Sequence, residues 1–301
     1  MTDAVTDSPA PASAATARWL VTGAAGMLGT ELVEALSDSA AGPRTSALTR
    51  AQLDITDGAA VKEAVAGFDV VVNAAAWIDV DGAEAQEETA AGVNGTGVRN
   101  LAEACAASGA RLLHVSTDYV FPGDATAPIP EDAPTAPINA YGRGKLIGEQ
   151  AVARLLPETG YVVRTAWLYG AHGGNFVRTI LNAAEKREFL DVVDDQRGQP
   201  TWARALAGQL VALGGAALAG AAPAGFYHGT CAGETTWFGL ARAAFELTGL
   251  DPDRVRPTTS DRFPRPAPRP GYSVLGHERW ARAGLAPLPH WRDCLARFLA
   301  G

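Results

Sequence analysis

The sequence predicts an α/β fold, namely a Rossmann-type doubly wound parallel sheet with a smaller, interleaved C-terminal substrate lobe. Short apolar and β-branched runs alternate with helical stretches up to about residue 165, a pattern typical of β-α-β units. A glycine-rich turn stands between the first strand and the first helix. Past residue 165 the alternation weakens, so a second and smaller lobe is expected there.

The individual elements follow from apolar runs and from the turns between them. The strands of the sheet are expected at residues 18–22, 45–48, 69–73, 111–115 and 161–164. Helices are expected at 27–36, 54–66, 82–107 and 141–156, and further on at 176–187, 202–218 and 237–247. The run DVVVN at 69–73 is typical of a strand buried on both faces. A short strand at 226–228 and an extended proline-rich segment at 262–271 complete the prediction.

Three segments are expected along the chain. Residues 1–17 are rich in Ala, Ser, Thr and Pro and are expected to form a flexible N-terminal tail. Residues 18–165 form the dinucleotide-binding domain, and residues 166–301 form mainly the substrate-binding lobe, with segments that return to the Rossmann core. Ligands of such sheets bind in the crevice beyond the carboxyl ends of the strands.

Composition narrows the class of protein and its partners. The 301 residues carry 25 Lys and Arg against 33 Asp and Glu, which gives a net charge of −8. This acidic balance argues against nucleic acid or an anionic membrane as a partner, since both favour basic patches. No apolar run approaches the roughly 18 residues that a membrane span needs, and residues 1–17 lack the features of a secretory signal. We therefore expect a cytoplasmic protein.

Cysteine and histidine spacing predicts neither a disulfide framework nor a metal site. The three cysteines, Cys105, Cys231 and Cys294, lie far apart and form no C-x-x-C pair. The five histidines show no spacing typical of metal ligands. The sequence therefore predicts free thiols and no structural metal.

The sequence GAAGMLG at residues 23–29 predicts a phosphate-binding turn. Glycines at this place permit a tight turn, close approach of the backbone to a pyrophosphate, and close packing of helix on strand. Free N–H groups at the start of the following helix then face the phosphates. The predicted cofactor contacts in this turn are Gly23, Gly26, Met27, Leu28 and Gly29.

The G-x-x-G-x-x-G spacing resembles that of the extended branch of the short-chain dehydrogenase/reductase superfamily. The segment Asn73-Ala74-Ala75-Ala76 resembles the N-A-A segment that lies beside the cofactor ribose in that branch, and the pair Asp54-Ile55 resembles one that lines its adenine pocket. The end of the second strand offers Arg50 in place of a carboxylate. A guanidinium can pair with a ribose 2′-phosphate, so NADPH is the expected cofactor, with NADH as the alternative.

A tyrosine and a lysine four residues apart indicate a proton-transfer site. Tyr141 and Lys145 share one face of a helix, and an ammonium beside a phenol lowers the phenol pKa. The same lysine can hold the nicotinamide ribose. Ser116 and Thr117 follow at a strand end, where a hydroxyl can orient the substrate carbonyl; neighbouring strand residues face opposite sides, so spacing alone does not choose between them.

Longer motifs resemble those of the dTDP-4-dehydrorhamnose reductases. These motifs are STDYVFPG at 116–123, NAYGRGK at 139–145, RTAWLYG at 164–170, NF at 175–176, DQRGQPT at 195–201, FYH at 226–228 and RPGYS at 269–273 with Leu275. The resemblance covers about residues 18–298. It implies transfer of a hydride from the nicotinamide to C4 of a dTDP-4-keto-6-deoxyhexose, possession of a Rossmann cofactor site, and a homodimer as one assembly to test.

The same resemblance implies roles for individual residues. Tyr141 is the expected proton donor, Lys145 tunes its pKa, and Thr117 is the orienting hydroxyl. The residues expected to contact the substrate are Val80, Ser116, Thr117, Tyr119, Tyr141, Trp167 and Asn175. The Trp167 indole can also lie against the apolar face of a deoxyhexose.

Two positions depart from the family pattern. Trp77 stands where the family often has His or Tyr. Some relatives hold magnesium with acidic residues at a subunit interface; Glu31 matches one such position, but Arg204 replaces an expected glutamate, so no metal is expected.

Two alternatives to a rhamnose-pathway reductase stay open. One is a 4-ketoreductase for a different dTDP-deoxysugar, of the streptose or antibiotic type. The other is a non-catalytic NADP-binding regulatory subunit, which could dispense with a proton donor that this chain retains.

Overall fold

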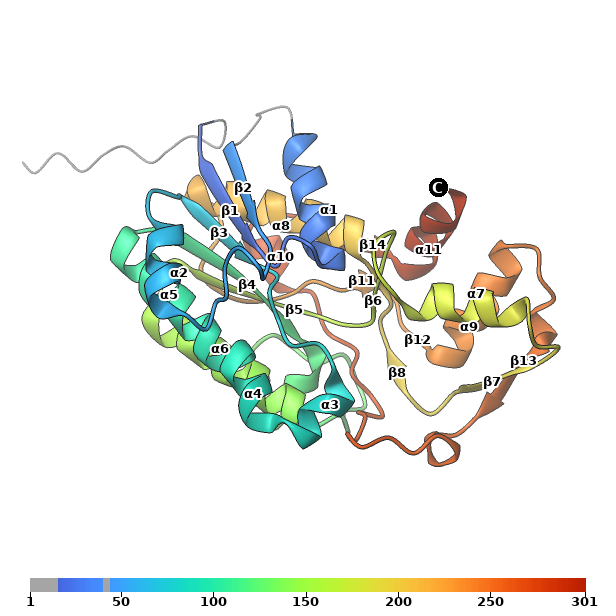
Figure 1. Cartoon of the computed structure of the whole chain (residues 1–301). Helices are drawn as coiled ribbons and strands as arrows, with labels where there is room; N and C mark the ends of the chain where they lie inside the picture. Colours follow the sequence, from blue (N-terminus) through green and yellow to red (C-terminus); the bar gives the residue numbers. More distant parts are fainter. Residues whose placement is uncertain (1–15, 40–43) are drawn as a thin grey trace, which may run out of the picture.

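A computed structural model describes residues 16–39 and 44–301 (Figure 1). The predicted tail therefore lies outside the described residues except for Thr16 and Ala17. Ala17 is fully buried in the core beside the first strand, so the packed part of the chain begins before residue 18. None of the helices in the described ranges is long and apolar enough to cross a membrane.

Six parallel strands form the central sheet. These strands are β1 (Arg18–Thr22), β2 (Arg44–Leu48), β3 (Val70–Asn73), β4 (Arg111–Thr117), β5 (Gly160–Thr165) and β10 (Gly225–His228). Their order across the sheet is β2-β1-β3-β4-β5-β10. The order reverses between β1 and β3, which is where open α/β sheets bind their ligands. The predicted Rossmann-type fold is confirmed.

Helices cover both faces of this sheet (Figure 1). One face carries α1 (Met27–Ser37) and α8 (Ala203–Leu218), and the other carries α2 (Gly58–Val65), α5 (Val98–Ser108) and α6 (Ala140–Leu155). Trp19 and Val21 of β1 point into the first layer, whereas Leu20 points into the second. Because side chains alternate along a strand, a strand with apolar residues at every position suits a sheet covered on both sides.

The long helix predicted at 82–107 is instead a broken series of elements. It consists of α3 (Val80–Ala85), α4 (Glu87–Ala91), a π-helical turn (Gly92–Gly97) and then α5. The wide turn holds Asn94, whose side chain accepts from Trp77 N and donates to Trp77 O. A π turn inside an α-helix often marks a functional site, and this one fixes the backbone beside the crevice.

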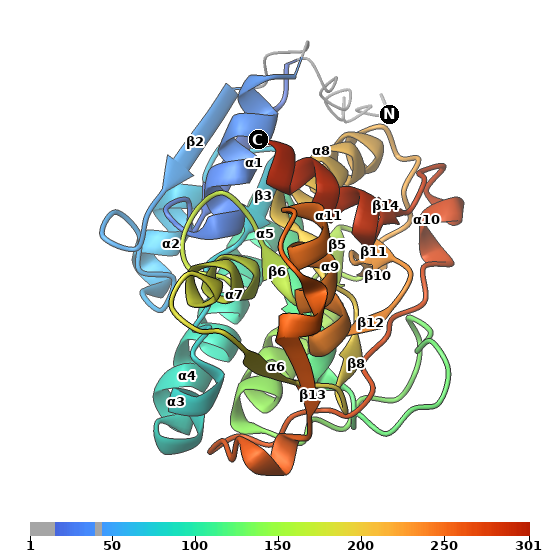
Figure 2. The ribbon, with the colours of Figure 1, turned by 90° about the vertical axis from the view of Figure 1, so that its right-hand side faces the viewer.

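The rest of the chain builds the smaller lobe from short elements (Figure 2). Its two-stranded ladders pair β6 (Leu168–Tyr169) with β9 (Thr201–Trp202), β7 (Leu190–Val193) with β13 (Val255–Thr258), β8 (Arg197–Gly198) with β12 (Thr235–Thr236), and β11 (Cys231–Ala232) with β14 (Leu288–His290). The helices are α7 (Phe176–Ala184), α9 (Trp237–Leu247) and α11 (Trp291–Ala300), with short 3₁₀ turns at Pro252–Arg254 and Ser260–Arg262. Helix α10 (Arg279–Arg282) contacts β10 of the sheet, and a further 3₁₀ turn, Asp118–Val120, directly follows β4. The ladders, α10 and α11 were not predicted. Strand β10 and helix α8 pack with the sheet although they follow residue 165; the domain boundary there stays a prediction.

Candidate active site

A cavity of about 580 Å³ opens at the carboxyl ends of β1, β3, β4 and β5. It brings together most residues that the sequence singled out: Gly23, Gly26, Met27, Leu28, Gly29, Arg50, Asp54, Ile55, Ala74, Ala75, Ala76, Val80, Ser116, Thr117, Tyr119, Tyr141, Lys145 and Trp167. Two predicted residues, Asn73 and Asn175, do not line it. The cavity lies at the place where the strand order reverses, so the fold itself puts these distant segments around one space.

The glycine turn after β1 is shaped by close backbone packing. Gly23 has a φ of +71°, which favours glycine, and a Cβ there would lie 2.5 Å from Ala75 N. A Cβ at Gly29 would collide with Gly23 O. Both glycines are therefore required by the turn and by its contact with the chain after β3.

The helix that follows this turn presents free N–H groups to the cavity. Gly26 stands at the N-cap of α1 and supplies no side-chain cap, and the first intrahelical bond runs from Thr30 N to Gly26 O. The N–H groups of Met27, Leu28 and Gly29 precede that bond and have no acceptor within the helix. Together with the positive end of the helix dipole, they form a site suited to a phosphate.

Asn73 lies fully buried beneath the cavity and supports its floor. Its Oδ1 accepts from Thr22 Oγ1 at 2.6 Å and from Ala75 N at 3.1 Å, and its Nδ2 is 3.0 Å from His114 Nδ1. Burial holds the pKa of His114 well below its ordinary value, with the charge of Lys145 as a smaller cause. Asn73 therefore ties β1, β3 and β4 together and positions Ala74–Ala76 rather than reaching the cavity itself.

Arg50 supplies a positive charge at one end of the cavity. It follows β2, is exposed, and lines the cavity with Asp54 and Ile55. The Asp54 carboxylate accepts from Thr56 N at 3.0 Å and from Thr56 Oγ1 at 2.8 Å, and these bonds, with a smaller effect of Arg50, lower its pKa. Asp54 is thus occupied by its own turn, which leaves the guanidinium as the group available to a ligand there.

Helix α6 aims Tyr141 and Lys145 into the cavity from its first two turns. Asn139 caps the helix by accepting from Gly142 N at 2.8 Å. Lys145 is 2% exposed and donates to Val115 O at 2.6 Å. Burial lowers the pKa of Lys145 to about 8, against a smaller opposite effect of Glu149. The ammonium form still predominates at neutral pH.

The pKa of Tyr141 is raised, not lowered as the sequence suggested. Burial is the main cause, the charge of Asp118 adds to it, and a hydrogen bond with Thr117 opposes it; the pKa reaches about 12. Sequence spacing places the lysine near the phenol but does not show how far the fold removes the phenol from water, so the effect of the lysine on the pKa was overestimated. A phenol with a high pKa is protonated at neutral pH, which is the form that a proton donor requires.

Thr117 and Asp118 lie behind the phenol. Thr117 Oγ1 donates to Asp118 Oδ1 at 3.0 Å and also hydrogen-bonds Tyr141. A hydroxyl has one proton, so Thr117 cannot donate to the carboxylate and to the phenol oxygen at the same time. Burial raises the pKa of Asp118 to about 6, although hydrogen bonds from Ser273 and Thr117 oppose this.

Two buried hydroxyls in the cavity have no protein partner among the described residues. Ser116 and Thr165 line the cavity, and the oxygens Ser116 Oγ and Thr165 Oγ1 are shielded from solvent. An unpaired buried polar group is costly. These hydroxyls, the free N–H groups of α1 and the buried ammonium of Lys145 fit a polar nucleotide cofactor and a sugar.

Aromatic side chains form part of the cavity wall. Tyr119 and Tyr141 meet edge to face, with ring centroids 6.0 Å apart. Trp167 and Trp237 stack with centroids 3.7 Å apart and planes 11° apart. Asn175 instead caps α7 by accepting from Arg178 N and donates to Gly170 O, so it shapes the loop next to this wall.

Sequence reasoning did not single out several residues of the cavity. Asp118 and Thr165 stand inside the quoted motifs, so their chemistry could have been considered there. Trp237 carries no local signal, because only the folded lobe brings it to Trp167.

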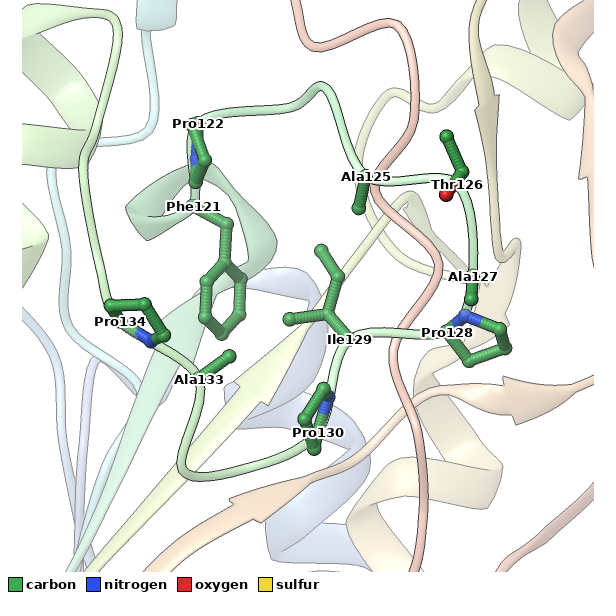
Figure 3. Close-up of a pocket in the computed structure, with 10 residues that line it drawn as sticks. All are labelled: Phe121, Pro122, Ala125, Thr126, Ala127, Pro128, Ile129, Pro130, Ala133 and Pro134. Atoms are coloured by element: carbon green, nitrogen blue, oxygen red, sulfur yellow. The ribbon is translucent and has the colours of Figure 1, made fainter.

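A second cavity of about 360 Å³ lies under the loop at residues 121–134 (Figure 3). Its ten lining residues include Phe121, Ile129 and four prolines, and none of the ten is charged. It therefore offers no charged group to a ligand.

Among the residues in the described ranges, no group of three or more His, Cys, Asp or Glu side chains is placed to hold a metal ion. Glu31 is buried in α1, whereas Arg204 is exposed at the start of α8, with its guanidinium 4.0 Å from Asp38.

Comparison with known proteins supplies the family. A family model described as the RmlD substrate binding domain matches residues 17–301. The chain belongs to this family. It is 58% identical over 280 residues to a dTDP-4-dehydrorhamnose reductase of Streptomyces griseus, covering 92% of this chain and 91% of the relative. It is 52% identical over 284 residues to a dTDP-4-keto-6-deoxy-D-glucose reductase of Streptomyces niveus, covering 94% and 96%.

A solved structure agrees with this family assignment. The dTDP-4-dehydrorhamnose reductase of Bacillus anthracis in complex with NADP matches with a TM-score of 0.87 and 34% identity, over 95% of this chain and 99% of that one. The resemblance stated from the motifs is confirmed, and so is the fold class.

Proposed function

We propose that this protein is a reductase that uses NADPH to reduce the C4 keto group of a dTDP-4-keto-6-deoxyhexose. The observation that carries the proposal is the meeting of Thr117, Tyr141 and Lys145 with the glycine turn in one cavity. A phosphate-binding turn accounts for the nucleotide, and the hydroxyl–phenol–ammonium set accounts for the proton that a ketone reduction consumes.

The cavity residues fit the two ends of the cofactor. The free N–H groups at the start of α1 would hold the pyrophosphate, Arg50 the 2′-phosphate, and Lys145 the nicotinamide ribose. When bound, the nicotinamide supplies the hydride. The further predicted contacts are Asp54, Ile55 and Ala74–Ala76, with Asn73 acting from beneath.

Tyr141 gives its proton to the oxygen of the reduced carbonyl. Burial and the charge of Asp118 keep the phenol protonated until then. As negative charge develops on the phenol oxygen, the hydroxyl of Thr117 can turn from Asp118 towards it, and the buried ammonium of Lys145 stabilises it. Tyr119, Val80, Ser116 and Trp167 line the space left for the sugar.

A reductase for a different dTDP-deoxysugar remains the second candidate. The Streptomyces niveus relative, named for dTDP-4-keto-6-deoxy-D-glucose, is 52% identical to this chain. The substrate of a rhamnose-pathway reductase and the substrate of this second candidate both carry the keto group at C4 and differ in the other ring substituents. A regulatory subunit is less favoured, because it has no need of the proton-transfer set.

Turnover tests the proposal directly. We expect purified protein to oxidise NADPH, measured by loss of its absorbance, when a dTDP-4-keto-6-deoxyhexose is added. A panel of 4-keto sugars differing at C2, C3 and C5 then separates the two candidates. If the protein turns over none of these sugars, with either NADPH or NADH, the proposal that it is such a reductase is wrong.

Arg50→Asp tests the cofactor preference. A carboxylate repels a 2′-phosphate and can accept from a ribose 2′-OH, so the ratio of kcat/KM for NADPH to that for NADH is expected to fall at least about tenfold, as for loss of one charge-assisted pairing. Arg44→Asp is a matched control, because Arg44 is also exposed but begins β2, whereas Arg50 follows the other end of that strand. An unchanged ratio in Arg50→Asp would show that Arg50 does not read the phosphate.

We also propose that the protein is cytoplasmic and forms a homodimer. All three cysteines are buried free thiols, as is usual in a reducing compartment. Light scattering of the purified protein tests the dimer.

A further inference from the structure

The aromatic wall of the cavity contains a tryptophan that the motifs did not single out. Trp237 begins α9, and its ring stacks face to face on Trp167 with centroids 3.7 Å apart. Both side chains line the cavity. Two ring faces this close are in van der Waals contact, so neither ring can tilt without moving the other.

Trp237 is itself held from several directions. Its indole N–H donates to Gln196 Oε1 at 3.1 Å, and Phe176 packs against it with centroids 4.6 Å apart. Gln196 Nε2 in turn donates to Ser260 Oγ at 2.8 Å, and Ser260 donates its N–H and hydroxyl to the carboxylate of Asp195, both at 2.7 Å. This chain of bonds anchors the Trp237 ring to the smaller lobe.

Trp167, by contrast, depends on its surroundings. Its φ of +47° is the only positive φ of a non-glycine residue in the described ranges. Such a conformation is costly and persists only when neighbouring structure enforces it. Its carbonyl accepts from Thr201 N at 3.2 Å, and a Cβ at Gly198 would lie 2.8 Å from two of its ring carbons. Backbone contacts and the Trp237 ring therefore confine the indole together.

We propose that Trp237 is a positioning residue for the sugar, acting by holding the Trp167 indole in the orientation that contacts the deoxyhexose. This inference rests on the proposed function, which puts the sugar against Trp167. Gln196 takes part by fixing the Trp237 ring. The stacked pair of Trp167 and Trp237 sets the affinity for the sugar ring. Proton transfer from Tyr141 and cofactor binding at the glycine turn do not depend on it.

The test compares three variants with one control. Trp237→Leu removes the stacked ring, and Trp237→Phe keeps a smaller ring. Gln196→Leu removes the acceptor of the indole N–H together with the donor to Ser260 Oγ. Trp291→Phe is the control, because Trp291 begins α11 and does not line the cavity. We expect Trp237→Leu to raise the KM for the sugar nucleotide about tenfold, at the upper range for an aromatic pair. Trp237→Phe and Gln196→Leu should raise it less.

Further measurements distinguish a positioning role of Trp237 from a general loss of structure. The kcat and the Kd of NADPH are expected to stay within about twofold of wild type in Trp237→Leu, since binding rather than chemistry is affected. Stacked indoles give a paired positive and negative band in far-ultraviolet circular dichroism, and this signal should disappear in Trp237→Leu and persist in Trp291→Phe.

The outcomes distinguish the inference from the proposed function. A wild-type protein that turns over no dTDP-4-keto sugar overturns the proposed function, and with it the sugar contact. A wild-type protein that turns over normally, with a KM in Trp237→Leu and Trp237→Phe equal to that of Trp291→Phe, overturns only the positioning role. A loss confined to kcat, or a lower KM in Trp237→Leu, also overturns it.

Discussion

Replacing Tyr141 by phenylalanine is expected to lower kcat by about 100- to 10,000-fold, the range in which a general acid contributes. The substitution keeps the ring and its edge-to-face contact with Tyr119 and removes only the hydroxyl. The half-buried phenol of Tyr141, whose pKa of about 12 keeps it protonated, is the proposed proton source that disappears. The loss should fall on kcat, because the proton moves in the transition state.

Tyr119→Phe is the matched comparison for this experiment. Tyr119 is a second half-buried phenol in the cavity, and desolvation raises its pKa too. Removing its hydroxyl should act mainly on the KM for the sugar. If Tyr141→Phe keeps more than about a tenth of wild-type kcat, the loss is smaller than the minimum expected on removing a general acid. The proton then comes from another group. Unchanged NADPH binding and melting temperature would show that neither variant has lost its fold.

Local signals account for the parts of the structure that the sequence predicted well. The apolar run at β3 and the glycines at Gly23 and Gly29 are read from neighbouring residues, because burial on both faces and a tight turn constrain residue type locally. The four-residue spacing of Tyr141 and Lys145 likewise needs only helix geometry. The fold class and most of the cavity lining follow from such signals.

Other features depend on contacts between distant segments. The two-residue strands of the smaller lobe are too short to show a period of alternation. The buried position of Asn73 and the stack of Trp237 on Trp167 arise only when several elements pack together. The pKa of Tyr141 was predicted in the wrong direction for the same reason, since desolvation is set by the whole fold.

A buried ion pair fastens helix α6 to the sheet. Arg164 of β5 donates through Nε and Nη2 to the Glu149 carboxylate of α6, at 2.9 and 2.8 Å, and both side chains are almost fully buried. The guanidinium also lies over the rings of Phe121 and Phe226. Glu149 is two turns beyond Tyr141 on α6, so the pair fixes the helix that carries the proposed proton donor.

Glu149→Gln is therefore expected to lower the free energy of unfolding by about 3–5 kcal/mol, because it leaves the Arg164 charge buried without its counter-charge. Glu87→Gln is the matched control. Glu87 pairs with Arg143 of the same helix in a similar two-bond geometry, at 2.7 and 2.9 Å, but both side chains are over 40% exposed, and its loss should cost less than about 1 kcal/mol. Urea unfolding curves measure the loss of stability in both variants, provided that the slope m stays the same as in wild type. Equal losses in the two variants would contradict the argument, because burial is the property that separates these pairs.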